Sequence, residues 1–531
     1  MNKKTVYLGI GVVVLVLAGA VLWMQRQSPS GQLVGDQPAN VADAAPSTPT
    51  EIVELKNGDT FDLTARIVKK TINGTSFRML AYNGSIPGPL LKVAQGAEVT
   101  INFKNETDIG TTIHSHGVRL DNKFDGVPDQ TQPLVPPGGS FTYKVKFPDA
   151  GLYWYHPHFR EDYAQELGLY GGYLVAPQMA DYWSPVNREV PLFLDDILIE
   201  NGQIRLSQAG ADHTLMGRYG NVMMVNGETN YSLNVQRGEV VRFYVVNVAN
   251  ARPFNFAIRN ATMKLVGADS GAYEREAWED GVTLGPSERA VIEVLFNQPG
   301  TFALQNKTPD RTVTLGSVTV SETLASPSYA EGFETLRKNN ETIASIDPFR
   351  ASFDREPDKR LALTIDMGGN MQGMQGMGHG AHMMPDGTMM GGSMMQTSPD
   401  GIEWEDSNTE MNATSNTDSV TWKVVDQDTG KENMDIDWTF TRGTPVKIRI
   451  FNDPKSMHPM QHPIHFHGQR FLVLSRNGVK EENLVWKDTV LVPSGQTVDI
   501  LLDPSNPGTW MAHCHIAEHL EAGMMFEYRV Q

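Results

Sequence analysis

Cysteine is nearly absent from this chain, with a single residue, Cys514, among 531. An intramolecular disulfide framework is therefore excluded, and a structural zinc site built on two or more thiolates is disfavoured. Basic residues are also outnumbered, at 44 Lys and Arg against 62 Asp and Glu, which gives a formal net charge of −18. This charge argues against nucleic acid as the main partner, because phosphate binding requires a basic face.

Helix-period segments of any length are lacking as well, and strand-period repeats take their place. One pattern has Gly at its fourth position, then alternating apolar residues, then Asn; its copies are VAQGAEVTINFKN (93–105), VQRGEVVRFYVVN (235–247) and FTRGTPVKIRIFN (440–452). A second pattern follows each copy, with a Gly that ends a turn before a strand; its copies are DAGLYWYHPH (149–158), QPGTFALQNK (298–307) and NPGTWMAHCH (506–515). Such alternation is typical of strands buried on one face.

Three copies of one β unit predict three related β domains. The expected class is all-β, sandwich or barrel, because the chain has many short strand-period segments bounded by turn signals and no long helix-period segment. The expected domains are 51–178, 179–325 and 355–531, and residues 326–354 are expected to link the second domain to the third.

The N-terminus predicts export of the rest of the chain. An uncharged apolar run from about Thr5 to Met24 is, at roughly 20 residues, long enough to span a bilayer. Lys3 and Lys4 before it predict a cytoplasmic N-terminus. Residues 1–25 are read as an uncleaved membrane anchor, with a cleaved signal peptide as the alternative, since AGA at 18–20 could be a cleavage site. The Pro-, Ala-, Gly- and Ser-rich residues 26–50 are predicted to be a flexible linker.

Ten of the 14 histidines fall in four tight clusters: HSHG, HPH, HPIHFHG and HCHIAEH. They lie in the first and third predicted domains, whereas the second has only His213, so it is expected to act as a spacer. On a strand, residues i and i+2 project from the same face. His513 and His515 can therefore reach one site while Cys514 points to another. A lone His-x-His is usually structural, but four clusters in register with a repeat indicate metal binding.

One thiolate, two imidazoles and a weak thioether is the blue-copper arrangement. The candidates are His462, Cys514, His519 and Met524. The remaining imidazoles are too many for one ion and suit a cluster of several coppers; they belong to His114, His116, His156, His158, His465, His467, His513 and His515.

These four motifs resemble those of the multicopper oxidases, the family of laccases, ascorbate oxidase and bacterial cuprous oxidases, over about residues 51–531. The resemblance implies three cupredoxin Greek-key β barrels and four copper ions. A type 1 copper would accept electrons singly from a substrate, and a type 2 and two type 3 coppers would reduce O2 to water. Position by position, the type 1 ligands would be His462, Cys514, His519 and Met524. The type 2 ligands would be His114 and His465. The type 3 ligands would be His116, His156 and His515 for one ion, and His158, His467 and His513 for the other.

Reduction of O2 also requires protons, and the resemblance points to carboxylates that could supply them. Asp125 in FDGVPDQ matches the family's acid near the type 2 copper, with a turn Asp before Gly as the plain alternative. Bacterial members often carry an acid directly after the last type 1 histidine. That position is Leu520 here, and the nearest acid, Glu521, is the candidate for the second proton route. Asp488 in WKDTV is expected to help receive a reducing metal ion near His462.

The Met-rich insert 367–395, in which ten of 29 residues are Met, bears on the substrate. Thioethers are soft ligands suited to Cu(I), and similar inserts occur in bacterial cuprous oxidases. Oxidation of Cu(I) is therefore predicted, with phenol oxidation as a further activity. Met457, His458 and Met460 could extend the copper path, although a plain loop is an equal interpretation. Two alternatives stay open: a laccase-like phenol or amine oxidase, and an extracytoplasmic copper-binding protein.

Overall fold

The protein is described by a computed structural model over residues 43–368, 382–383, 389–390 and 399–531. The predicted anchor 1–25 lies outside the described residues, as does most of the Met-rich insert. Among the described residues, no helix is long and apolar enough to cross a membrane.

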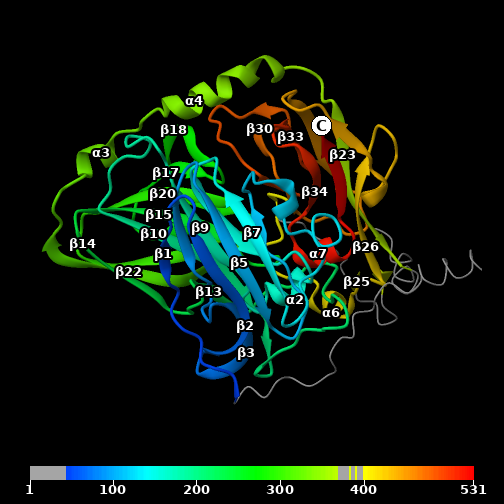
Figure 1. Cartoon of the computed structure of the whole chain (residues 1–531), viewed down its shortest axis with the longest axis horizontal. Coiled ribbons are helices and arrows are strands. Elements are labelled where there is room, and N and C mark those ends of the chain that lie inside the picture. Colours follow the sequence, from blue (N-terminus) through cyan, green and yellow to red (C-terminus); the bar gives the residue numbers. More distant parts are fainter. Residues whose placement is uncertain (1–42, 369–381, 384–388, 391–398) are drawn as a thin grey trace, which may run out of the picture. The chain divides into compact units, whose positions relative to one another are not determined.

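The first part of the chain forms two sheets, with strand orders β3-β2-β5-β7 and β1-β4-β9-β8-β6 (Figure 1). The strands are β1 (Ile52–Glu54), β2 (Thr60–Ile72), β3 (Thr75–Tyr82), β4 (Leu90–Ala94), β5 (Glu98–Glu106), β6 (His114–His116), β7 (Ser140–Lys146), β8 (Gly151–His156) and β9 (Gly171–Ala176). Two short helices accompany them, η2 (Asn122–Phe124) and α2 (Glu161–Ala164).

The middle part repeats this plan with the orders β13-β10-β15-β20-β17-β18 and β14-β22-β21-β16-β19. Its strands are β10 (Arg188–Ile197), β13 (Val222–Val225), β14 (Tyr231–Arg237), β15 (Glu239–Asn247), β16 (Phe254–Ile258), β17 (Met263–Ala268), β18 (Gly271–Glu279), β19 (Val282–Leu284), β20 (Arg289–Phe296), β21 (Gly300–Lys307) and β22 (Thr312–Leu324). A separate hairpin is made of β11 (Ile199–Glu200) and β12 (Gln203–Ile204).

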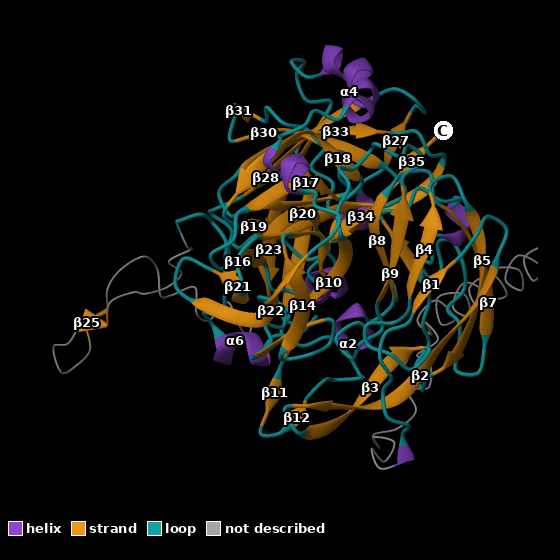
Figure 2. Cartoon of the chain, turned by 90° about the vertical axis from the view of Figure 1, so that its left-hand side faces the viewer, coloured by secondary structure: helices purple, strands orange, loops and turns teal. Residues whose placement is uncertain are grey.

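The last part has the orders β26-β23-β28-β33-β30-β31 and β27-β35-β34-β29-β32 (Figure 2). Its strands are β23 (Lys359–Met367), β26 (Val420–Asp426), β27 (Trp438–Phe440), β28 (Val446–Asn452), β29 (His462–Phe466), β30 (Arg470–Arg476), β31 (Val479–Lys480), β32 (Thr489–Val492), β33 (Thr497–Asp503), β34 (Gly508–Cys514) and β35 (Met525–Val530). The helices are α6 (Thr409–Thr414), η5 (Asn433–Asp435) and α7 (Ala517–Glu521), and a further two-stranded hairpin pairs β24 (His382–Met383) with β25 (Met389–Met390). The all-β prediction is confirmed, with three pairs of packed sheets.

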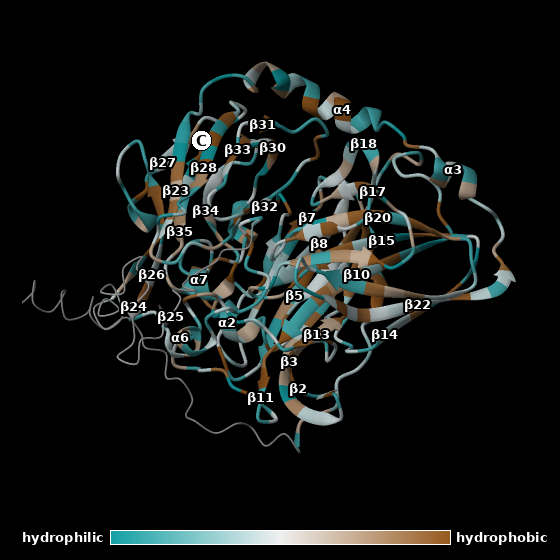
Figure 3. Cartoon of the chain, turned by 180° about the vertical axis from the view of Figure 1, so that it is seen from behind, coloured by the Kyte–Doolittle hydropathy of each residue, from teal (hydrophilic) through white to brown (hydrophobic). Residues whose placement is uncertain are grey.

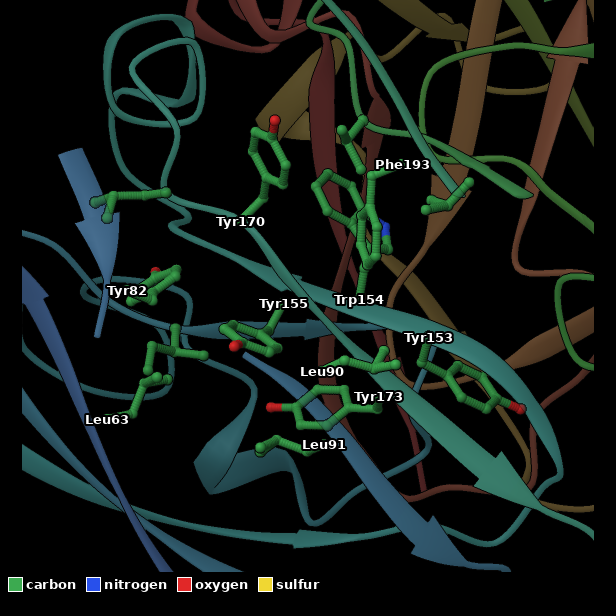
Figure 4. Packing of buried hydrophobic residues seen from close by; sticks show 14 of the residues in the cluster. Leu63, Tyr82, Leu90, Leu91, Tyr153, Trp154, Tyr155, Tyr170, Tyr173 and Phe193 are labelled. Atoms are coloured by element: carbon green, nitrogen blue, oxygen red, sulfur yellow. The ribbon is translucent and has the colours of Figure 1, made fainter. Parts of the chain in front are cut away.

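Each pair of sheets encloses an apolar core because alternate side chains point inward. On β5, Val99, Ile101 and Phe103 are buried while their neighbours are not. Figure 3 shows hydrophobic and hydrophilic residues interspersed along the strands. In the first core, Tyr155 of β8 packs between Tyr82 and Tyr173, with ring centroids 5.3 and 5.0 Å away (Figure 4).

Two predicted linkers have more structure than expected. Within residues 43–50, Ser47 N donates to Lys69 O (2.9 Å) and Thr48 N donates to Gly84 O (2.8 Å), so this end of the 26–50 linker is fastened to the first pair of sheets. Residues 326–354 contain the short helices α3 (Ala330–Glu334), α4 (Asn340–Ile346) and η3 (Asp347–Ser352). Ile346 is fully buried with Trp486, which anchors this connection to the third part of the chain.

Candidate metal centre

Strand pairing brings the histidine motifs together two by two. Strands β6 and β8 are antiparallel with His114 opposite His156, and β29 and β34 are antiparallel with His465 opposite His513. The i, i+2 spacing then turns the second histidine of each motif to the same side. The four motifs, far apart in the sequence, therefore face one another between the first and third parts of the chain.

The imidazoles meet in three groups whose ligand atoms lie within 4.8 Å of one another. They are His114 with His116 and His465, His116 with His156 and His515, and His158 with His467 and His513. In the last group, His467 Nε2 is 3.0 Å from His513 Nε2 and 3.3 Å from His158 Nε2. The last two groups have the same members as the two implied type 3 sets, whereas the first adds His116 to the implied type 2 pair. All eight side chains are buried, and the assignment of ligands to individual coppers remains a prediction.

One ring nitrogen in six of these eight histidines is held by an oxygen atom. Main-chain carbonyls accept from Nδ1 of four rings: His114 (Asp125 O, 2.8 Å), His156 (Pro157 O, 2.7 Å), His465 (Asp488 O, 2.8 Å) and His513 (Cys514 O, 2.8 Å). An oxygen acceptor places the proton on that nitrogen and leaves the lone pair on the other. Nε2 of His114, His156 and His465 has no hydrogen-bond partner although it is buried, as expected for a metal ligand.

Burial disfavours the charged form of seven of these rings: His116, His156, His158, His465, His467, His513 and His515. Desolvation lowers the pKa of His116 and His465 well below the ordinary value, and each neighbouring imidazole adds to the effect. The pKa of His513 falls to about 4 for the same main reason. A neutral imidazole is the form that binds a metal ion, so the cluster is a fitting site for copper.

The lone thiol lies in a second, separate group. Cys514 Sγ is 3.6 Å from His462 Nδ1 and 3.7 Å from His519 Nδ1, and the two nitrogens are 3.3 Å apart. Burial raises the pKa of the Cys514 thiol, which favours its protonated form. A bound metal ion would stabilise the thiolate instead. Met524 is fully buried, and its main chain bonds both Cys514 N and His519 O. Thiolate, two imidazoles and a neighbouring thioether fit a blue-copper ion.

Trp422 of β26 closes the thiol site from one side. Its ring stacks on His519 at a centroid distance of 4.2 Å and meets His462 edge-on at 4.7 Å. Its Nε1 donates to Thr214 O of the middle part (2.7 Å). Because of this cover, His462 is only 1 % exposed and His519 is not exposed at all.

Asp125 lies among the histidines, as the sequence predicted. It is fully buried; one carboxylate oxygen accepts from His467 Nδ1 (2.9 Å), and the other is 3.3 Å from His114 Nδ1. It therefore touches rings from two of the groups, and its proton role remains a prediction.

The expectation for Asp488 was wrong in location. It is not beside His462, because it precedes Thr489, which pairs with His465. The carboxylate is fully buried, with Oδ1 3.0 Å from His116 Nε2, and it forms an ion pair with Arg289 (2.5 Å). Both carboxylate oxygens are bonded to His116 or Arg289, so neither is free to receive a metal ion.

Glu521 lies on α7, facing α2. Burial and the nearby Asp162 raise the pKa of its carboxyl to about 7. The carboxylate nearest the cluster on this side was missed from the sequence: Glu161 of α2 is fully buried, with oxygens 3.7 Å from His158 Nε2 and 3.9 Å from His156 Nδ1. The sequence offered one indication of this contact, because Glu161 follows the HPH motif by only three residues. The proton role of Glu521 remains a prediction.

A buried histidine cluster beside a one-thiolate site, on three pairs of β sheets, defines a copper oxidase. Models of multicopper oxidases match residues 65–180, 184–328 and 404–531. The chain belongs to the multicopper oxidase family, so it is an oxidoreductase that uses copper as cofactor, as predicted.

Similar proteins cover nearly the whole chain. Multicopper oxidase mco of Staphylococcus aureus is 26% identical over 86% of this chain and 85% of its own length. A copper resistance protein A homolog of Pseudomonas syringae pv. tomato is 24% identical over 90% and 93%. The solved structure of a multicopper oxidase from Campylobacter jejuni, titled a metallo-oxidase, has a TM-score of 0.67 at 24% identity and covers 94% and 99%; it shows the shared fold.

Proposed function

We propose that this multicopper oxidase takes its electrons from Cu(I) and passes them to O2. The observation that carries the proposal is His458, four residues before His462. It is 2 % exposed, and neither ring nitrogen has a hydrogen-bond partner among the described residues. Its ring is 6.3 Å from Trp422, the residue that covers the thiol site. Burial lowers the pKa of His458 to about 4, so it offers a free lone pair.

The closed thiol site favours a small reductant over a phenol. A flat organic molecule would have to touch the edge of His462 or His519, and both are buried under Trp422. A metal ion needs only soft or imidazole ligands on its way in. His458 and the buried Met460 supply both kinds next to His462. The similarity to a copper resistance protein A homolog supports the same choice of substrate.

The residues then divide the work. Copper, when bound, supplies one-electron oxidation at the thiol site and reduction of O2 at the histidine cluster. Cys514 joins the two, since its chain neighbours His513 and His515 belong to the cluster. Main-chain oxygens fix the ligand rings, and Asp125 holds His467 by its Nδ1. We also propose that the protein acts outside the cytoplasm, held by residues 1–25.

The test is oxygen uptake by the copper-loaded enzyme with Cu(I) and, separately, with a dimethoxyphenol. We expect His458→Ala to lower kcat/KM for Cu(I) by about 10-fold or more, the scale of losing one outer metal contact, and to leave phenol turnover unchanged. Deletion of residues 369–398 is expected to act in the same direction. The matched control is His213→Ala, because His213 bonds Asp212 in the middle part. Equal Cu(I) oxidation by the His458 variant, with faster phenol turnover, would identify a laccase instead.

A further inference from the structure

Arg289 begins β20, in the part of the chain that was expected to be a spacer, yet it points at the histidine cluster. It is 1 % exposed, and all five of its side-chain N–H groups can be accounted for by bonds. Nε donates to Leu152 O (3.1 Å), Nη1 to Ser287 O (3.2 Å) and Nη2 to Asp269 O (3.0 Å). The two remaining bonds form a fork on Asp488, at 2.6 Å to Oδ1 and 2.5 Å to Oδ2.

Asp488 in turn contacts two cluster histidines. Its Oδ1 accepts from His116 Nε2 (3.0 Å), and its main-chain oxygen accepts from His465 Nδ1 (2.8 Å). Thr489 Oγ1 lies 3.1 Å from the same two nitrogens. His116 Nδ1 is then left buried and without a partner, on the side where a ligand atom is needed. The carboxylate therefore decides which nitrogen of His116 is free.

The glycine of HSHG makes room for this pair. Gly117 has φ +79°, and a Cβ at that position would overlap Asp488 Oδ2 and come within 2.8 Å of Arg289 Nη2. A side chain on residue 117 is thus excluded both by its backbone and by the Arg–Asp fork. The motif that carries two ligands is shaped around a residue from the middle part of the chain.

We propose that Arg289 is a positioning residue for the side of the cluster on which His116, an implied type 3 ligand, lies beside His465, an implied type 2 ligand. Its planar fork fixes the carboxylate of Asp488, and Asp488 fixes the tautomer and the tilt of His116 and the orientation of His465. A lysine could compensate the charge but could not hold both oxygens and Leu152 O together. The middle part of the chain is then more than a spacer. The proposal holds for any reductant, so it is independent of the choice of Cu(I) above.

The experiment compares copper-loaded Arg289→Gln, Arg289→Lys and Asp488→Asn with the parent enzyme. We expect Arg289→Gln to weaken copper binding by the cluster at His116 and His465 by about 10- to 100-fold, the usual effect of losing an outer partner of a metal ligand. The type 2 EPR signal should fall and O2 turnover with it, while the blue absorption of the Cys514 site is retained. Asp488→Asn should reproduce this pattern, and Arg289→Lys should retain copper with altered type 2 hyperfine splitting.

Arg242→Gln is the matched control. Arg242 is also buried in the middle part, where it pairs with Glu293 and Glu189, and none of its bonds reaches a histidine. It should lower stability without changing the type 2 signal. A full type 2 signal and normal turnover in Arg289→Gln would overturn the proposal. So would a loss of all coppers to the same extent in both arginine variants, since that would mean support of the fold alone. If Arg289→Gln does not fold, an unaltered type 2 spectrum in Arg289→Lys and Asp488→Asn decides against it.

Discussion

At the scale of the residue, a histidine in this protein is prepared as a ligand by what its other nitrogen touches. Main-chain carbonyls hold the rings of His114, His156 and His513, and these acceptors are present whatever side chain their residue carries. Side chains hold His116 and His467, through Asp488 and Asp125. Substitutions at these two carboxylates can therefore alter the ligands without removing one.

Replacement of Cys514 by Ser should separate the two halves of the site. Sγ lies between the Nδ1 atoms of His462 and His519, and no other thiol exists in the chain. A serine hydroxyl is a poor copper ligand, so the blue absorption and oxidase turnover with every reductant should be abolished. The histidine cluster keeps all its ligands, and copper analysis should still find the type 2 and type 3 ions. Residual turnover with a phenol would show electrons entering by another route.

At the scale of the element, two of the four histidine motifs, HSHG and HPIHFHG, end at a glycine that has a positive φ and lies against a packed side chain. In HPIHFHG this is Gly468, with φ +64°, and a Cβ there would overlap the ring of the buried Trp510. Gly478, in the turn between β30 and β31, has a similar φ of +77° but no atom within 4 Å of the added carbon. The two positions therefore separate backbone strain from overpacking.

Alanine at these two glycines should cost different amounts of stability. Gly478→Ala should lower the free energy of unfolding by about 1 kcal/mol, because alanine disfavours the left-handed backbone conformation. Gly468→Ala adds the displacement of Trp510, for a total of about 3 kcal/mol or more. Denaturant unfolding of the two variants measures the difference, and copper content shows whether His467, next to Gly468, has moved. Equal losses at both positions would mean that Trp510 yields without cost.

At the scale of the whole molecule, the sequence predicted what is local and periodic. Repeats predicted three β units, and the motif spacing predicted that paired histidines face one site, because both follow from strand geometry over a few residues. The division of the histidines into ligand sets came from the family resemblance. Arg289 and Glu161 could not be found in this way. Arg289 reaches the cluster from a domain with no motif, and Glu161 reaches it from a short helix. Asp488 was misplaced because nothing in WKDTV reveals its partner. Contacts between domains are tertiary, and one sequence does not encode them as a pattern.

The many neutral imidazoles should make the whole molecule sensitive to acid. Burial lowers the pKa of ten histidines: His116, His156, His158, His458, His462, His465, His467, His513, His515 and His519. In the unfolded chain they titrate near pH 6.5, so below that pH the unfolded state binds more protons than the folded state. The free energy of unfolding must therefore fall as the pH falls, by up to about 1.4 kcal/mol per pH unit for each fully protonating residue. Above about pH 7 this dependence should vanish.

Bound copper should determine the pH at which this loss of stability unfolds the protein. Ions that bind only the folded state add to its stability, so copper removal should lower the melting temperature at neutral pH and move acid unfolding to a higher pH. Thermal unfolding of copper-loaded and copper-free protein, at about pH 7.5, 6.5 and 5.5, measures both shifts. His458→Ala supplies the control, because the pKa of His458 is about 4 and its loss should reduce proton uptake on unfolding by roughly one. A copper-free protein as stable at pH 5.5 as at pH 7.5 would contradict the neutral, buried state of the cluster on which its affinity for copper depends.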